Sequence, residues 1–139
     1  MATVELSFTP LPAHVRTARL VATAVARRSG VDESLLDVVR LAVGEACSRA
    51  VEGHQLHCPA EPVRLSLSDS ADRFEVEVTD YCAPGDAARP AGDGKTEGQA
   101  LPAGLGIAVI TGLADDVEIS ETPAGTSIRM SWPSAGAAR

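Results

Sequence analysis

The stretch Asp37–Gly53, DVVRLAVGEACSRAVEG, decides how the rest of this chain is interpreted. Its apolar and small residues recur with the spacing of one broad helical face, at Val38, Leu41, Ala42, Gly44, Ala46 and Ala50. Glu45 and Arg49 are four residues apart, so their side chains lie one above the other on the same side of that helix. A carboxylate and a guanidinium on a helix of small, apolar residues require an explanation.

Two interpretations of this pair are open. The first is an i,i+4 ion pair that supports the helix by about 0.2–0.5 kcal/mol. The second is a functional pair, in which the carboxylate and the guanidinium act on a ligand and Arg49 binds phosphate groups. In the second case Arg49 would act without a metal ion, because a guanidinium has no lone pair to offer a cation.

The composition indicates a single globular domain over residues 1–139. Hydrophobic residues make up 45% of the chain and charged residues 22%, and the length is sufficient to bury a core. The net charge of −7 argues against direct binding to nucleic acid or to an anionic membrane, because phosphates would be repelled. No apolar run reaches the ~20 residues of a membrane span, and the N-terminus lacks the features of an export signal. We therefore expect a cytoplasmic protein.

The histidines and cysteines match no known metal motif. His54, His57 and Cys58 fall within a stretch that we interpret as a polar loop, His54–Pro62, and Cys82 lies elsewhere. A structural zinc site needs four ligands at characteristic spacings, so no metal site is predicted. The three cysteines, without a CxxC motif or an export signal, predict reduced thiols rather than a disulfide framework.

The first part of the chain predicts one strand followed by two helices. Alternating apolar residues indicate a half-buried strand at Thr3–Phe8. A helix is expected from Pro12, a residue favoured in the first turn, to about Arg28, where a serine and a glycine follow. The next helix begins after Asp32, which we expect to be its N-cap, and continues to about Glu52.

The remainder predicts two hairpins, separated by a segment that lacks apolar periodicity and by a short helix. In order, these are strands Val63–Ser68 and Phe74–Thr79, a lid loop at 81–102, a helix at Ala103–Ala114, strands Val117–Glu121 and Thr126–Trp132, and a flexible tail at 133–139. Hairpins need helices to cover one face of their sheet. The expected fold is therefore α+β, a two-layer sandwich whose mainly antiparallel, mixed sheet is covered on one face by three helices.

The order of these elements and three short motifs resemble the GHKL (Bergerat-fold) ATPases, and within them the small anti-sigma factor serine kinases of the RsbW and SpoIIAB type. The first motif, E-A-x-x-N-A in that family, corresponds here to the segment Glu45–Ala50, EACSRA. The second is a strand that ends in Asp80, and the third is a GLG turn at 104–106 before a helix. The resemblance covers nearly the whole chain and implies a histidine-kinase-like ATPase domain.

The resemblance also implies a role for each of these residues. Glu45 corresponds to the base that activates the attacking hydroxyl, and Asp80 to the acceptor of the adenine amino group. Gly104 and Gly106 correspond to the turn that presents backbone N–H groups to phosphate. Without the resemblance, Asp80 is explained as well by an Asx turn at the strand end, and the two glycines by close packing of a helix on the sheet.

Two departures from the family pattern concern nucleotide binding. Arg49 stands where the family has the asparagine that holds Mg²⁺ on the phosphates, and a guanidinium cannot ligate a cation. Residues Tyr81–Pro84 lack the glycines that follow the aspartate in the family, so the backbone there resists curling around adenine. We therefore expect no metal and no cofactor, with ATP and Mg²⁺ bound only if kinase activity persists.

Three functions are compatible with this pattern. We favour a pseudokinase that acts by partner switching: an anti-sigma factor that sequesters a sigma factor and is released by a STAS-type anti-sigma-factor antagonist. The alternative is an active ATP-dependent serine kinase that phosphorylates such an antagonist, and the third is a module that senses a nucleotide or a partner without sigma control. Family members use the face of the early helices for contacts and often form homodimers through it, so partner binding is expected at Arg16, Arg19, Arg27 and Arg28.

Overall fold

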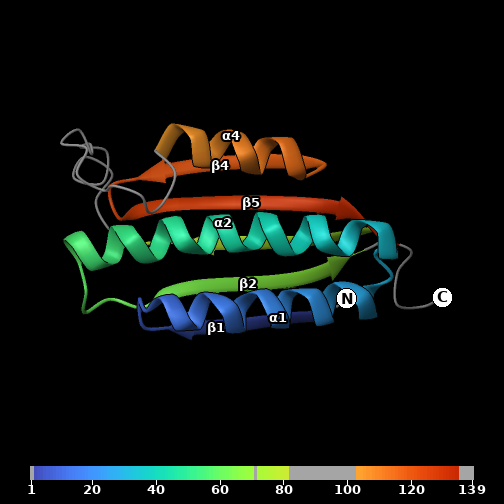
Figure 1. Ribbon diagram of the computed structural model, residues 1–139, viewed down its shortest axis with the longest axis horizontal. Helices are drawn as coiled ribbons and strands as arrows, with labels where there is room; N and C mark the ends of the chain where they lie inside the picture. The colour runs from blue at the N-terminus through green and yellow to red at the C-terminus, as the bar shows by residue number, and fades with distance from the viewer. Residues whose placement is uncertain (1, 71, 82–102, 135–139) are drawn as a thin grey trace.

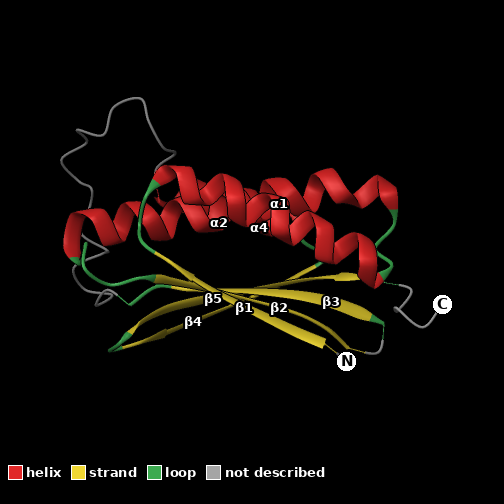
Figure 2. Cartoon of the chain, turned by 90° about the horizontal axis from the view of Figure 1, so that it is seen from below, coloured by secondary structure: helices red, strands yellow, loops and turns green. Residues whose placement is uncertain are grey.

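Three helices form one layer of the molecule and a five-stranded sheet forms the other (Figure 1, Figure 2). The computed structural model describes residues 2–70, 72–81 and 103–134. The elements are, in chain order, β1 (Ala2–Phe8), α1 (Pro12–Ser29), α2 (Glu33–His57), β2 (Val63–Ser70), β3 (Arg73–Thr79), α4 (Ala103–Leu113), β4 (Asp116–Thr122) and β5 (Gly125–Pro133). The predicted α+β two-layer sandwich, with three helices on one face of the sheet, is confirmed.

The strand order in the sheet is β1-β2-β3-β5-β4. Every neighbouring pair of these described strands is antiparallel, so the prediction of a mixed sheet is wrong. The physical reason lies in the connections. A short turn joins β2 to β3, and another joins β4 to β5; such turns link only antiparallel strands. The pairs β1–β2 and β3–β5 are antiparallel as well.

The core lies between the two layers. On β3, Phe74, Val76 and Val78 are buried and alternate with half-buried residues, and Phe74 stacks on Trp132 of β5 with 6.3 Å between ring centroids. Helix α2 lies between α1 and α4 along the middle of the helical layer (Figure 1). The opposite face of the sheet carries polar side chains, and no described helix covers it (Figure 2).

Helix α2 begins where the sequence predicts but ends later. Asp32 is its N-cap, and the Asp32 carboxylate accepts a hydrogen bond of 3.0 Å from the backbone N–H of Ser34. The helix continues past Glu52 to His57, so the predicted end at Glu52 and the loop expected from His54 are wrong. The side chain of His54 is completely buried, and this tertiary packing stabilises an extra turn that local sequence signals did not indicate.

The other boundaries lie close to their predicted positions. Helix α1 ends at Gly30, which adopts the left-handed conformation with φ of 93° and donates its N–H to the last turn. The predicted lid at 81–102 lies outside the described residues apart from Tyr81, and so do residues 135–139 of the predicted tail, whose first residue, Pro133, instead ends β5. None of the described helices combines the length and the apolar character needed to cross a membrane.

Candidate functional site

Glu45 and Arg49 lie in the middle of α2, and both side chains are half-buried. Among the described residues, no ion pair joins Glu45 to Arg49, so the structural interpretation of this pair is not realised. The Nε atom of Arg49 is buried and has no hydrogen-bond partner among the residues that the structure describes. A buried donor without an acceptor costs about 1–3 kcal/mol, which leaves this guanidinium available for an anionic ligand or partner.

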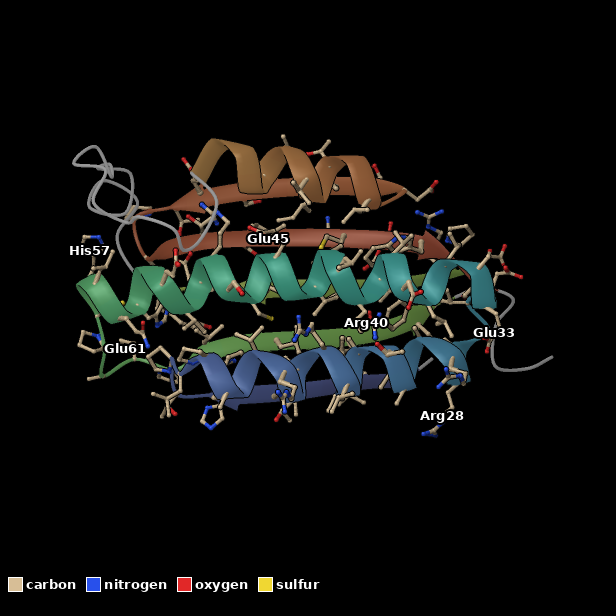
Figure 3. All side chains as sticks on the ribbon, viewed as in Figure 1. Arg28, Glu33, Arg40, Glu45, His57 and Glu61 are labelled. Atoms are coloured by element: carbon tan, nitrogen blue, oxygen red, sulfur yellow. The ribbon has the colours of Figure 1, made fainter. Side chains whose placement is uncertain are left out.

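A second carboxylate shares the exposed side of α2 with Glu45. Glu52 follows two helical turns later, and its pKa is raised, first by burial and then by the negative charge of Glu45. Figure 3 shows Glu45 and Arg40 on opposite sides of α2, with Arg40 toward α1. Glu45 therefore points away from the α1 side of the helix, where Arg40 lies.

Asp80 follows β3, and it both donates a hydrogen bond to Thr126 of β5 and accepts one from it. Its backbone N–H donates to the carbonyl of Thr126 at 2.9 Å, and its Oδ1 accepts from the backbone N–H of Thr126 at 3.1 Å. The Asx turn that we considered would bond within its own segment, whereas this carboxylate bonds across the sheet. Gly125 makes the approach possible: its φ is +151°, and a Cβ there would lie 2.0 Å from the carbonyl oxygen of Asp80.

Two residues of this region were missed by sequence reasoning. One is Thr126, whose only signal is the glycine that precedes it in the hairpin. The other is His54, whose Nδ1 lies 2.8 Å from the carbonyl oxygen of Glu61 and whose Nε2 accepts the backbone N–H of Tyr81 at 2.9 Å. His54 lies on the buried face of α2, seven residues after Cys47. This helical spacing is the sequence pattern that could have indicated a buried histidine.

The cysteine prediction needs a correction. Cys47 is a free, buried thiol, and burial raises its pKa to about 12, although the nearby charge of Arg19 lowers it. Cys58 is disulfide-bonded, so the expectation of reduced thiols is wrong for this residue. Within the described ranges, no three His, Cys, Asp or Glu side chains gather as metal ligands.

Gly104 and Gly106 lie in the first turns of α4, which begins at Ala103 as predicted. Helix α4 packs beside α2, the helix that carries Glu45 and Arg49. The structure thus brings the helix of the first motif next to the helix of the third. The phosphate-binding role of the two glycines stays a prediction.

The four arginines predicted to bind a partner fall into two groups. Arg16 and Arg19 line a surface hollow together with residues of both early helices, here called the α1–α2 groove: Arg16, Arg19, Leu20, Arg40 and Leu41. Arg27 pairs with Glu33 at 3.5 Å, and the exposed Arg28 lies at the same end of α1 (Figure 3). Arg27 follows Arg16 by eleven residues, about 16 Å along a helix, so the groups form separate surfaces.

Comparison with known proteins identifies the class. Residues 8–132 match the model of the histidine kinase-like ATPase domain family. The chain is 26% identical over 129 residues to the serine-protein kinase RsbW of Halalkalibacterium halodurans, covering 86% of this chain and 76% of the relative. Its fold resembles the RsbU and RsbW domains of Rv1364c from Mycobacterium tuberculosis, with a TM-score of 0.68 and 17% identity over 94% of this chain.

The match over residues 8–132 places this chain in the histidine kinase-like ATPase domain family. The serine-protein kinase RsbW and the RsbW-containing structure are proteins to which the chain is similar within this class. The chain spans about a third of the mycobacterial chain, 32% of its length, so that neighbour supports the fold alone.

The family binds ATP with Mg²⁺, and the residues present at the metal position do not fit that ion. By the resemblance to the GHKL motif, Arg49 corresponds to the metal-holding asparagine, and its nitrogens are donors only. Magnesium requires oxygen ligands, and a guanidinium would also repel it. The orphaned Nε of Arg49 is suited instead to an anion.

Proposed function

We propose that this protein is an anti-sigma factor that sequesters a sigma factor by direct binding and is released by a STAS-type anti-sigma-factor antagonist. In this proposal ATP binding and kinase activity are weakened or lost. The similarity to a serine-protein kinase RsbW supports the anti-sigma factor and serine kinase class, to which both this proposal and its alternative belong. The α1–α2 groove is the observation that carries the proposal, because it supplies a binding surface that needs no catalysis.

The composition of the α1–α2 groove is that of a protein-binding surface. Leu20 and Leu41 are 61% and 54% exposed, whereas Leu36, Leu65 and Leu67 are buried in the core. Arg40 is already paired with Asp37 at 2.9 Å, whereas neither Arg16 nor Arg19 forms an ion pair with another described residue. Exposed leucines flanked by arginines favour a partner whose contact face is both apolar and acidic.

The groove also favours one direction for a bound helix. Arg19 lies at its boundary with a second hollow, whose lining includes Ser48, Glu52 and Gln55. The charged residues that line the α1–α2 groove are all arginines, whereas the second hollow places the carboxylate of Glu52 near the guanidinium of Arg19. A partner helix with acidic residues at one end and a basic residue at the other would match both.

Two features of the candidate nucleotide site support the loss of catalysis. Arg49 cannot take the place of a metal ligand, and phosphoryl transfer in this kind of enzyme depends on a metal that bridges the phosphates. Residues Tyr81–Pro84, which follow Asp80, lack the glycines that the family has there, so the backbone resists curling around adenine. Both features weaken turnover without affecting the α1–α2 groove.

A binding experiment tests the proposal. The tagged protein is used to capture partners from its native cytoplasm, with and without MgATP, and sigma factors are identified by mass spectrometry. We expect capture of a sigma factor without MgATP, loss of capture for Arg16→Glu, and normal capture for the matched control Arg64→Glu, an exposed arginine of β2 outside the groove. Failure to enrich any sigma factor, or equal loss in both variants, would overturn the proposal.

One observation supports the kinase alternative. The carboxylate of Glu45 is half-buried and not neutralised by Arg49, as a catalytic base would require. Incubation of the captured antagonist with the protein and MgATP distinguishes the two functions. Phosphorylation of a serine on the antagonist that disappears with Glu45→Gln would establish the kinase.

A further inference from the structure

His54 connects three segments that are distant in the sequence. It lies in the last turn of α2 and its side chain is completely buried. One ring nitrogen contacts the connection between α2 and β2, at the carbonyl of Glu61, and the other contacts the exit of β3, at the N–H of Tyr81. A single imidazole therefore ties the end of the central helix to the point where the chain leaves the sheet.

The chemistry of the two partners fixes the protonation state of the ring. The backbone N–H of Tyr81 can only donate, so Nε2 of His54 must be the acceptor. The carbonyl of Glu61 can only accept, so Nδ1 must carry the hydrogen. A neutral imidazole has one donor and one acceptor, and both are used here. A doubly protonated ring would set Nε2–H against the N–H of Tyr81.

The hydrogen bond to Tyr81 also acts on Asp80, the preceding residue. Asp80 is held on its other side by the two hydrogen bonds with Thr126. The path of the chain at this point is further restricted by Gly125, which the carbonyl of Asp80 approaches too closely for a side chain. The segment that follows β3 is thus hydrogen-bonded to α2 through His54 and to β5 through Thr126.

Within residues 2–70, 72–81 and 103–134, no charged side chain is bonded to the ring as a counter-ion for an imidazolium. His57 on α2, Glu61 in the connection and Arg64 on β2 have exposed side chains. The Oδ1 atom of Asp80 is directed to the N–H of Thr126, and Cys58 is disulfide-bonded. Among the described residues, no carboxylate bonds to the ring of His54. A second proton there would be a buried and unpaired charge.

We propose that His54 is the residue that positions Asp80 and Tyr81, and that a second proton on its ring releases the exit of β3 from α2. In its neutral form His54 holds the segment in place. In acidic solution the hydrogen bond from Tyr81 to His54 is lost, while the two hydrogen bonds between Asp80 and Thr126 remain. This coupling does not depend on which partner the protein binds, so it stands apart from the proposed function.

Substitutions that keep only one of the two hydrogen bonds of the ring distinguish a positioning role of His54 from a packing role. In His54→Gln the amide oxygen can replace Nε2 as the acceptor for Tyr81, and in His54→Asn the amide N–H can replace the Nδ1 donor to Glu61. His54→Leu keeps an apolar side chain and removes both hydrogen bonds. Neither amide takes up a proton in the range in which histidine titrates.

The measurement is hydrogen exchange of single amides by NMR, on the full chain, at about pH 7 and about pH 5. We expect the protection factor of the Tyr81 amide to fall roughly tenfold or more at the lower pH in the natural protein. In His54→Gln protection should persist at both pH values, and in His54→Asn and His54→Leu it should be low at both. The amide of Val76, inside the β3 ladder, is the control and should not change.

Two outcomes would overturn the proposal. One is a Tyr81 amide whose protection is the same at both pH values in the natural protein. The other is the same loss of protection in His54→Gln, because that variant has no imidazole to protonate. If His54→Leu fails to fold, the natural protein and His54→Gln still decide the question between them.

Discussion

Gly44 on α2 lies directly beneath the side chain of Arg19 on α1. A Cβ atom at Gly44 would come 2.7 Å from Cδ of Arg19 and 3.3 Å from its Cγ. Because position 44 has no side chain, the stem of Arg19 crosses α2 and reaches both hollows between the helices. A glycine on the central helix therefore sets the position of an arginine that we assign to partner binding.

Gly44→Ala should weaken partner binding without destabilising the fold. The new methyl group displaces Arg19, and we expect the Kd for the captured sigma factor to rise roughly tenfold, a change of about 1.4 kcal/mol. Stability in urea should stay equal or increase, because alanine favours the helix over glycine by about 0.5–1 kcal/mol. Calorimetric titration and denaturation curves measure the two effects.

Gly53→Ala is the matched control for this substitution. It lies on the same helix, and nothing lies within 4 Å of a Cβ built there. It should gain the same helical stability with unchanged affinity. Equal affinities for the two variants would show that Gly44 does not position Arg19.

Glu52→Gln should stabilise the protein at neutral pH. Burial and the charge of Glu45 raise the pKa of Glu52, so the folded state disfavours its ionised form. A raised carboxyl pKa means that the folded state holds the proton longer, so this residue lowers stability as pH rises through the folded pKa. The melting temperature of Glu52→Gln should exceed that of the natural protein at pH 7, with the difference vanishing below the unfolded pKa. A difference that persists in acid would refute this cause.

Asp80→Ala and Asp80→Asn should differ in stability. Alanine leaves the N–H of Thr126, a buried residue, without its acceptor, at a cost of about 1–3 kcal/mol. Asparagine keeps an oxygen at the same position and should cost less than half of that. Urea denaturation of both variants provides the comparison, and equal losses would mean that the carboxylate contributes through its charge alone.

Titration with MgATP should give no thermal shift. A ligand present at 100 times its Kd stabilises the folded state by about 2.7 kcal/mol, which a melting curve resolves easily. Arg49→Asn alone should not restore binding, because Tyr81–Pro84 still lacks the glycines of the family pattern. A clear shift for the natural protein would support the kinase alternative, and a shift only for Arg49→Asn would show that the turn is competent.

The elements of the fold could be predicted because their signals are local. The N-cap at Asp32, the glycine after α1 and the alternation in Phe74–Thr79 each depend on neighbours in the sequence. The end of α2 could not be predicted in this way. It depends on His54 reaching Glu61 and Tyr81, contacts that only the folded sheet brings together.

The candidate site was predicted less completely than the fold. The spacing of Glu45 and Arg49 placed both on one helix, but spacing alone did not show that they remain unpaired. The strand-end position of Asp80 was predicted, whereas its partner Thr126 was not, because β5 is added to β3 from 46 residues away in the chain. The pairing of two strands that are far apart in the chain produces no periodic pattern in the sequence of either strand.

The concealed thiol of Cys47 gives this protein an internal reporter of its own opening. Alkylating reagents attack the thiolate, and a side chain that is fully covered with a pKa of about 12 offers almost none at neutral pH. Labelling at this position would therefore proceed only when α2 lifts from the sheet. The rate of modification then measures how often α2 separates from the sheet in the native state.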